Sequence, residues 1–567
     1  MEPTRIFDLL DRYLELFPDK QDALAKKTRQ GWIKYSIQDY KEHVDNLSLG
    51  LLALGVKAGD RIATVTDNRP EWNFFDMAMA QIGVVHVPVY PTIGQEEYRF
   101  ILNHSEARYL VIGSQALYKK IKPIADDVKT VKDIYTLDRV EGANYWKLIL
   151  ELGQKHNEDY SKKLNERRKA VQETDMATII YTSGTTGLAK GVMLSHRNII
   201  QNVFPGQKQL PLYNQDRILS FLPLCHVYER MLNYIFHYKG ISIYYAQNMG
   251  TIKNDLVEIR ANGFNTVPRL LEKVHEAIIK KGKEQPLHIR KIFERAVKVA
   301  ENFEYHKLKN PWYRRQYAVL DKLVFKHWRK ALGGNIKFVG CGGAALGIRL
   351  NRFFHAAGIN IQEGYGLTET SPLVAFNYTT YPNKRFGTVG LVLENEEVKI
   401  ADDGEILVKG PNVMLGYYKE PGLTKEVIDQ DGWFHTGDIG TFVDGKFLKI
   451  TDRKKEMFKT SAGKYISPQS VENKLKQSFY ISQALVVGEN ERFAAALISP
   501  NFNDLQVWAK ANGVHTDDNK TLIKDEKVIK FIEKEINKIN KSLGDVEKIV
   551  RFRLVCDEWS PETGELS

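Results

Sequence analysis

The sequence predicts an α/β protein with a large N-terminal domain and a small C-terminal domain. Helical patterns alternate with short β-branched strands such as "RIATVT" (61–66) and "GVVHVPVY" (83–90), an order that favours parallel sheets. The 567 residues are 43% hydrophobic, enough for three or four folded units with sizeable cores. We expect a large domain of two α/β subdomains and a small β-barrel-like subdomain, followed by a small mobile α+β domain.

Changes of pattern along the chain indicate where these parts begin and end. The helical period stops from 381 to 450, and the charged, core-poor "TDRKKE" (451–456) is a plausible boundary. A long helical, basic and aromatic insert lies at 270–333. The expected parts are an N-terminal α/β subdomain (1–175), a second α/β subdomain (176–380), a small β subdomain (381–451) and a mobile C-terminal domain (452–567).

The composition argues against several classes of protein. No run of eighteen apolar residues occurs, so no membrane span is predicted, and "MEPTRIFDLLDRYLELF" (1–17) is typical of an amphipathic helix rather than a signal peptide. Cys225, Cys341 and Cys556 are widely separated and have neither CxxC nor ligand spacing. We therefore expect no disulfide framework, no zinc cluster and a reducing, cytoplasmic location.

The formal charge of +11 would suit nucleic acid, an anionic membrane or a small anionic substrate. There is no pure Lys/Arg tail and no recognised nucleic-acid module, so we expect no nucleic-acid partner. An anionic substrate is the favoured specific interpretation, and solvated lysines on helix faces account for most of the charge. Peripheral contact of the basic insert with the inner face of a membrane stays open beside the simpler interpretation, a solvated helix pair.

The loop "YTSGTTGLAKG" (181–191) carries the first chemical signal. The sequence around it predicts a strand at 177–181, the loop, a short strand and a helix capped by Ser195. Glycines allow backbone N–H groups to approach an anion closely, which makes the loop a phosphate cradle. It is not a Walker A loop, because Lys190 stands between Ala189 and Gly191. The cradle comprises Thr182, Ser183, Gly184, Thr185, Thr186, Gly187 and Lys190.

This loop resembles the signature of the adenylate-forming superfamily, which includes acyl-CoA synthetases, luciferases and peptide-synthetase adenylation domains. A second family motif is "QEGYGLTETSP" (362–372). The resemblance implies that Tyr365, beside Gly366, offers a flat face to a purine and that Thr368 offers a hydroxyl to the α-phosphate. It also implies that Glu369, with Thr182, holds Mg²⁺, which prefers a few carboxylates and phosphate oxygens.

Two further stretches match the family in position. The turn in "GCGGAAL" (340–346) would stack its backbone against adenine, through Gly342, Gly343 and Ala344. In "DGWFHTGDIG" (431–440), Asp438 would bind both ribose hydroxyls, as acidic residues do in other nucleotide sites.

The segment "DRKKEMFKTSAGKYISPQSVE" (452–472) resembles the hinge of the family. Arg453 would reach the ribose or the phosphate, and Lys455 falls where family members rotate the C-terminal domain. Gly463 would line the entry path of the thiol. Charged residues suit a hinge because they lose little burial when they move.

The stretch "FLPLCHVYERM" (221–231) and the helical insert look most like long-chain fatty acyl-CoA synthetases. His226 would then lie near the reactive carboxylate and the acyl pocket, in the same subdomain as the ATP site. The resemblance implies that a fatty acid attacks Mg-ATP to give acyl-adenylate and pyrophosphate, and that CoA then takes the acyl group and releases AMP. The implied catalytic residues are Thr182, Lys190, His226, Thr368 and Glu369.

One family feature has no match before the final "WSPETGELS" (559–567). Family members carry a C-terminal lysine that contacts the substrate carboxylate and α-phosphate, and neither Lys541 nor Lys548 stands in that context. We therefore expect poor adenylation by the chain as given, with conversion of preformed acyl-adenylate by CoA retained.

Two other functions stay open at this point. One is an adenylating ligase for another carboxylic acid, or one that uses a carrier protein as acceptor. The other is a catalytically weakened nucleotide- or acyl-binding protein that lacks the C-terminal lysine.

Overall fold

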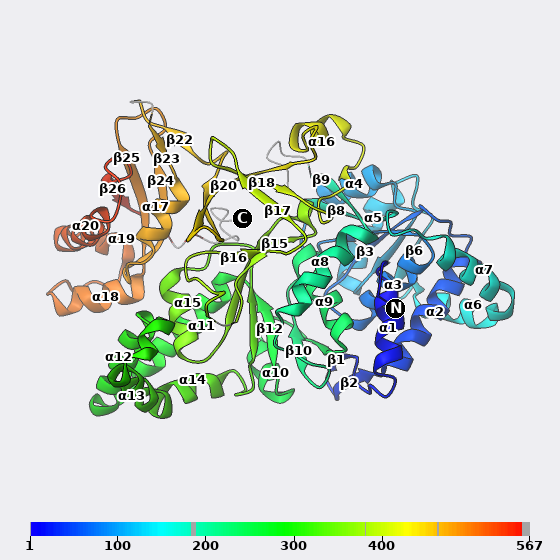
Figure 1. Cartoon of the computed structure of the whole chain (residues 1–567), viewed down its shortest axis with the longest axis horizontal. Helices are drawn as coiled ribbons and strands as arrows, with labels where there is room; N and C mark the ends of the chain where they lie inside the picture. Colours follow the sequence, from blue (N-terminus) through cyan, green and yellow to red (C-terminus); the bar gives the residue numbers. More distant parts are fainter. Residues whose placement is uncertain (1, 183–188, 380, 462–463, 558, 560–567) are drawn as a thin grey trace. The chain divides into compact units, whose positions relative to one another are not determined.

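The computed structural model is mixed α/β and describes residues 2–182, 189–379, 381–461, 464–557 and 559 (Figure 1). The chain divides into two compact units. The larger comprises Met1–Val398 and Val408–Phe434, and the smaller comprises Lys399–Leu407 and His435–Ser567. The predicted fold class, with a large N-terminal part and a small C-terminal part, is therefore confirmed.

The first sheet of the larger unit is parallel at its centre and antiparallel at one edge. Its strands lie in the order β19-β9-β8-β4-β3-β5-β6-β7. The predicted strands "RIATVT" and "GVVHVPVY" form the parallel neighbours β3 and β4, whereas β9 is antiparallel to both β8 and β19. The bounds are β3 Arg61–Val65, β4 Val85–Val89, β5 Tyr109–Ile112, β6 Asp133–Thr136, β7 Asn144–Tyr145, β8 Met176–Thr182, β9 Lys190–Ser195 and β19 Gly416–Tyr417.

The second sheet of the larger unit runs β16-β15-β14-β13-β12-β10-β11-β1-β2. Neighbours from β1 to β14 are parallel, and β2, β15 and β16 are antiparallel to the strands beside them. The bounds are β1 Leu24–Thr28, β2 Gly31–Tyr35, β10 Arg217–Ser220, β11 Ser242–Tyr245, β12 Gly263–Thr266, β13 Phe338–Cys341, β14 Ile361–Gly366, β15 Leu373–Phe376 and β16 Gly390–Val392.

The two sheets exchange strands along the sequence. β1 and β2, near the N-terminus, belong to the second sheet, whereas β8 and β9 belong to the first. Residue 175 therefore does not separate the two sheets, because a parallel strand pairs with whichever neighbour its crossover reaches, whatever its place in the chain. The division into 1–175, 176–380, 381–451 and 452–567 remains a prediction.

Helices cover both faces of the first sheet. Alternate strand residues such as Val65 and Leu110 pack with α4 and α5, while Ile62 and Val111 point to the core that contains α2 and α3. The helices up to the insert are α1 Asp8–Leu16, α2 Ile37–Ala53, α3 Pro70–Gln81, α4 Gln95–Ser105, α5 Gln115–Asp126, α6 Lys147–Lys155, α7 Asn157–Ala170, α8 His196–Lys208, α9 Val227–Lys239 and α10 Ile252–Glu258.

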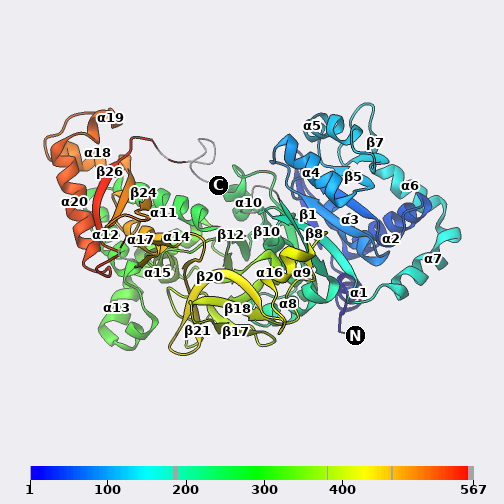
Figure 2. The same cartoon turned by 90° about the horizontal axis from the view of Figure 1, so that it is seen from above.

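The predicted helical insert is confirmed (Figure 2). Its helices pack partly on α15 Ile348–Ala356, which follows β13. The insert contains α11 Pro268–Lys283, α12 Leu287–Glu301, the 3₁₀ turn η1 Tyr305–Lys309, α13 Pro311–Leu320, the π-helical turn η2 Asp321–Phe325 and α14 Lys326–Ala331.

Local sequence signals around the first motif are also confirmed. β8 contains the strand predicted at 177–181, and Ser195 caps α8 by accepting a hydrogen bond from the Asn198 backbone N–H. The expectation that the helical period stops from 381 to 450 is wrong at α16 Pro421–Val427. This helix has two turns, too few for a 3.6-residue period to be visible in the sequence.

The smaller unit is α+β, as expected. β20 Phe434–Val443 pairs antiparallel with β21 Phe447–Arg453. A second sheet has β24 antiparallel and β26 parallel to β25, and its apolar residues pack with α17 and α20 in a separate core. The remaining bounds are β17 Glu397–Ile400, β18 Glu405–Lys409, β22 Phe458–Lys459, β23 Tyr465–Ile466, α17 Pro468–Leu475, β24 Ile481–Val487, β25 Ala494–Pro500, α18 Phe502–Ala511, α19 Asn519–Leu522, α20 Glu526–Asn540 and β26 Ile549–Leu554.

Candidate active site

The two ends of the signature loop face each other across a strand pair. Thr182 ends β8, Lys190 begins β9, and the two residues are partners in the antiparallel ladder. A cation and a hydroxyl are thereby fixed at one sheet edge. The predicted cradle residues Ser183, Gly184, Thr185, Thr186 and Gly187 lie outside the described residues.

A tyrosine that sequence reasoning missed joins the two predicted motifs. β19 places Tyr417 opposite Val192 on β9, and the ammonium of Lys190 lies 5.1 Å from the centre of the Tyr417 ring. The Tyr417 hydroxyl donates a 2.8 Å hydrogen bond to Oε1 of Glu369. Lys190, Tyr417 and Glu369 therefore form a continuous set of contacts. No spacing rule singles out Tyr417, because β19 joins the first sheet from more than 200 residues along the chain.

The Glu369 main chain is fixed as well. The Met414 N–H donates a 2.8 Å hydrogen bond to the carbonyl of Glu369, from the segment that leads into β19. Burial, and then the neighbouring carboxylate, raise the pKa of Tyr417 well above its ordinary value. Tyr417 thus keeps its proton and acts as a donor toward Glu369.

The second motif is a tight turn that only glycine can start. A Cβ at Gly366 would lie 1.6 Å from the carbonyl oxygen of Pro372. The turn continues as the 3₁₀ helix η3 Thr368–Thr370 and ends at Ser371, which has a φ of 68°. These constraints fix the direction of Thr368 and Glu369. Tyr365 is only 7% exposed, on β14 opposite Ala375.

The turn predicted to meet adenine lies beside this motif. β13 and β14 are parallel neighbours, so residues 342–344 and 367–369 follow the carboxyl ends of adjacent strands. Ligands of open α/β sheets bind at such strand ends. Gly343 has a φ of 80° and is exposed with Ala344, while a Cβ at Gly342 would lie 3.3 Å from the Tyr228 ring.

His226 is the N-cap of α9. Its Nδ1 accepts a 3.1 Å hydrogen bond from the Tyr228 backbone N–H, and its ring lies edge-on to Tyr90 with centroids 6.5 Å apart. Burial lowers the pKa of His226, so the neutral ring with its hydrogen on Nε2 is favoured. The structure gives His226 a capping role and leaves Nε2 as a donor.

Two charged residues of the same stretch, Glu229 and Arg230, were not predicted as site residues. Both are fully buried on α9. Glu229 accepts hydrogen bonds from Ser220 on β10, at 2.6 Å, and from Asn265 on β12, at 2.8 Å. Burial without a cationic partner raises the pKa of Glu229 to about 7.

Arg230 contacts the first sheet and its covering helix, whereas Glu229 contacts the second sheet. Its guanidinium donates 2.6 Å to Asp76 on α3 and 2.8 Å to Thr178 on β8. Adjacent residues of α9 therefore tie this helix to both sheets. The consecutive charges "ER" inside an otherwise buried helix were the available signal, because a buried charge requires a specific partner.

In the smaller unit, the structure brings together two residues predicted to bind the ribose. Asp438 on β20 and Arg453 on β21 are ladder partners, and Nε of Arg453 lies 3.6 Å from Oδ1 of Asp438. The Asp438 side chain is 9% exposed and that of Arg453 is 62% exposed. Gly463, predicted to line the thiol path, lies outside the described residues.

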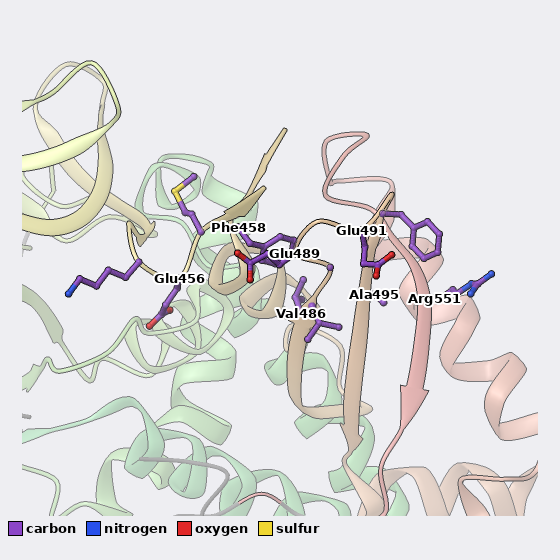
Figure 3. Close-up of a pocket in the computed structure, with 12 residues that line it drawn as sticks. Glu456, Phe458, Val486, Glu489, Glu491, Ala495 and Arg551 are labelled. Atoms are coloured by element: carbon purple, nitrogen blue, oxygen red, sulfur yellow. The ribbon is translucent and has the colours of Figure 1, made fainter. Parts of the chain in front are cut away.

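Lys455 is exposed and lines an open pocket of about 670 Å³ in the same unit. Figure 3 shows Glu456 and Phe458 from the predicted hinge segment on one side of this pocket and Arg551 from β26 on the other. The pocket therefore connects the hinge segment to the three-stranded sheet of the smaller unit.

A narrow apolar cavity lies in the larger unit, behind the second motif. Its volume is about 40 Å³, and it lies between α8, α9 and strands β13 to β15. Glycines at 206, 340 and 364 leave room where a side chain would collide with Ile235, Tyr228 and Leu373. The lining residues are Gly206, Leu210, Tyr228, Met231, Leu232, Ile235, Phe338, Gly340, Gln362, Gly364, Leu373 and Phe376.

Neither three-carboxylate nor histidine-rich metal clusters occur among the described residues. The two predicted magnesium ligands, the Glu369 carboxylate of the second motif and the Thr182 hydroxyl of the first, are both hard oxygen donors. Such a set fits Mg²⁺ held mainly by phosphate oxygens of a bound nucleotide.

Known family models match most of the chain. The AMP-binding enzyme family matches residues 10–418, and the AMP-binding enzyme C-terminal domain matches 456–563. A long-chain-fatty-acid–CoA ligase of Mycobacterium bovis is 33% identical over 94% of this chain and 89% of its own length. The peroxisomal long chain acyl-CoA synthetase 7 of Arabidopsis thaliana is 31% identical over 94% of this chain and 79% of its own.

Solved structures show the same fold. An anthranilate CoA ligase in complex with anthranoyl-AMP has a TM-score of 0.72 at 17% identity, covering 99% of this chain and 95% of that one. A Mycobacterium tuberculosis fatty acyl CoA synthetase has a TM-score of 0.63 at 20% identity, covering 100% and 97%. The predicted resemblance is confirmed, and the chain belongs to the AMP-binding enzyme family.

Proposed function

We propose that this chain is an AMP-forming long-chain fatty acid–CoA ligase. The single observation that carries the proposal is the joining of Lys190 to Glu369 through Tyr417, which unites the two nucleotide motifs at one sheet edge. Relatives named as long-chain ligases, about 30% identical over most of the chain, supply the acyl class. Fatty acid, ATP and CoA are the proposed substrates.

In the first half-reaction, a carboxylate oxygen of the fatty acid attacks the α-phosphorus, and the bond to pyrophosphate breaks. Two anions must meet, so positive charge and aligned donors matter more than acid–base groups. Lys190 supplies the cation, and Thr182 and Thr368 supply hydroxyl donors. Tyr417 holds the Glu369 carboxylate in one orientation, and Glu369 with Thr182 would hold Mg²⁺. The ion, when bound, offsets the negative charge of the phosphates.

The proposed contacts to the nucleoside are those that the family resemblance implies. Tyr365, Gly366 and the turn 342–344 are proposed to contact adenine, and Asp438 is proposed to accept hydrogen bonds from both ribose hydroxyls. Arg453, whose Nε lies 3.6 Å from Oδ1 of Asp438, is proposed to contact the ribose or a phosphate.

The second half-reaction needs the CoA thiolate to attack the acyl carbonyl and release AMP. We assign the hinge to Lys455 and the thiol path to Gly463, as the family resemblance implies. Nε2 of His226 is the proposed donor near the acyl carbonyl. The narrow cavity between α9 and β14 is the proposed start of the acyl site, because its lining is almost wholly apolar and the straight chain of a fatty acid fits a narrow space.

The test is the fate of labelled oxygen. Palmitate labelled with ¹⁸O in its carboxylate, incubated with Mg-ATP and CoA, should give palmitoyl-CoA and AMP that carries one ¹⁸O atom. The label must appear in AMP because the attacking carboxylate oxygen stays on phosphorus when the thioester forms. Unlabelled AMP, or release of ADP, would exclude an acyl-adenylate intermediate.

A further inference from the structure

The positive charge of the chain is concentrated in the helical insert. Residues 268–333 contain 17 Lys and Arg against 7 Asp and Glu, a formal charge of +10. The whole chain carries +11, so the remaining residues are nearly neutral. A field of one sign over so short a segment favours an anionic partner at this place on the surface.

The same insert exposes an apolar stripe. The helix runs without a break from α13 through η2 into α14, and Trp312, Val319 and Leu323 on it are 81%, 51% and 50% exposed. Spacings of seven and four residues place all three on one side of a helix. We call these three residues the apolar stripe. A tryptophan this exposed is unusual on a surface that contacts only water.

Three cations accompany the stripe at a constant spacing. Arg315, Lys322 and Lys326 each follow a stripe residue by three positions, and all three are exposed. Within the part of the chain that the structure describes, no salt bridge engages them, whereas the nearby Arg329 is paired with Asp321 at 2.6 Å. Their charge is therefore available to an external anion, and their long aliphatic stems can lie along an apolar surface.

The neighbouring helix extends this surface. α12 packs beside α13, and the two helices are labelled next to each other in Figure 1. At the start of α12, Leu287 is 69% exposed, and Ile289 and Ile292 are 42% and 41% exposed. Arg290 pairs with Glu294 there, whereas Lys291 is exposed, so this end of α12 contributes both apolar area and positive charge.

We propose that the apolar stripe and its three cations dock the larger unit on an anionic lipid bilayer. Tryptophan and aliphatic side chains would enter the headgroup boundary, while Arg315, Lys322 and Lys326 meet lipid phosphates. An exposed helix with apolar and basic side chains together can lie along the flat surface of a bilayer. The docking itself rests on charge and exposure; its purpose, access to fatty acid dissolved in the bilayer, rests on the proposed function.

The experiment is flotation of the full chain with vesicles of phosphatidylcholine, with and without phosphatidylglycerol. Binding should require the anionic lipid and weaken with added salt. The triple variant R315E/K322E/K326E should lose about 100-fold in vesicle partition, since each basic residue contributes about fivefold near an anionic surface. Trp312→Ser should lose about tenfold through its apolar contact alone.

A matched control changes the same charge elsewhere. The variant K119E/K129E/K162E alters three exposed lysines of the same unit and should keep most of the binding. Subtracting the fluorescence spectrum of Trp312→Phe from that of the wild type gives the emission of Trp312. This emission should shift to the blue when anionic vesicles are added, and should not shift with neutral vesicles. Octanoate-dependent pyrophosphate release should be equal in all variants, which separates docking from catalysis.

Three results would overturn the proposal. The first is an equal loss of vesicle binding in the control and in the stripe variant. That result would show that binding depends on the net charge of the chain and not on the position of the three cations. The second is binding of double-stranded DNA by the wild type without binding of anionic vesicles. The third is a dimer in solution that Trp312→Ser abolishes, which would make the stripe a contact between copies. The vesicle measurement needs no ligase activity, so failure of the proposed function would leave it intact.

Discussion

The hydroxyl of Tyr417 donates a 2.8 Å hydrogen bond to the carboxylate of Glu369, while the Tyr417 ring lies 5.1 Å from the Lys190 ammonium. One side chain thus orients an anion and contacts a cation from two motifs separated by more than 170 residues. Loss of the hydroxyl alone would leave the ring contact in place, so the two roles of Tyr417 can be separated.

Tyr417→Phe should lower kcat/KM for Mg-ATP while having a smaller effect on the stability of the fold. A hydrogen bond to a charged group contributes about 1.5–3 kcal/mol, so we expect roughly 10- to 100-fold lower kcat/KM and a higher Mg²⁺ concentration at half-maximal rate. Pyrophosphate release measured as a function of Mg²⁺ checks this. Tyr418→Phe, the same change at the next residue, should have little effect. Equal losses in both variants would contradict the role given to Tyr417.

Asp438→Asn should remove discrimination between ribose and deoxyribose. The wild type should use ATP better than 2′,3′-dideoxy-ATP by roughly 100-fold, because the carboxylate would lose both hydroxyl partners. The variant should use both nucleotides at similar low rates. Competition between the two nucleotides, measured by pyrophosphate release, gives the ratio. A ratio unchanged by the substitution would place the ribose elsewhere.

Burial of Glu229 should make stability depend on pH. Its pKa is raised to about 7 in the folded chain, so the folded state holds this proton more tightly than the unfolded state does. The stability that this proton supplies is fully present below pH about 4.5 and is lost as pH rises toward about 7, by about 3 kcal/mol in total.

Glu229→Gln keeps a similar shape and cannot ionise. The difference in apparent Tm between this variant and the wild type should therefore move in favour of the variant as pH rises from 5 to 8. Thermal unfolding across that range is the measurement. A Tm difference that does not change with pH would mean that Glu229 is not a buried neutral carboxyl.

Gly366→Ala should disrupt the second motif. The added Cβ would lie 1.6 Å from the Pro372 carbonyl oxygen, so the turn must move and carry Thr368 and Glu369 with it. We expect a loss of about 3 kcal/mol or more in stability, or nearly complete loss of pyrophosphate release in the folded fraction. Gly347→Ala is the matched control, because a Cβ there meets nothing within 4 Å. Normal activity in Gly366→Ala would refute this account of the turn.

Sequence patterns predicted the elements that local chemistry determines. The β-branched runs gave β3, β4 and β8, and the serine at 195 marked the start of α8. The motif residues Thr182, Lys190 and Glu369 were recognisable because they stand in stretches that resemble the motifs of the adenylate-forming superfamily.

The rest depends on long-range pairing. Tyr417 reaches Glu369 only because β19 pairs with β9, and a strand of two residues leaves no periodicity to detect. Arg230 finds Asp76 across 154 positions, so its partner could not be inferred from spacing. The strand exchange between the two sheets has the same origin, because parallel strands pair through crossovers of any length.

The most direct test of the central claim is acid-dependent pyrophosphate release from Mg-ATP, with acetate, octanoate, palmitate, oleate and 4-coumarate, with and without CoA. The proposed function predicts that release peaks with palmitate or oleate and that CoA converts the product to acyl-CoA and AMP. Release that peaks with 4-coumarate, or no release from any acid while ATP still binds, would contradict it.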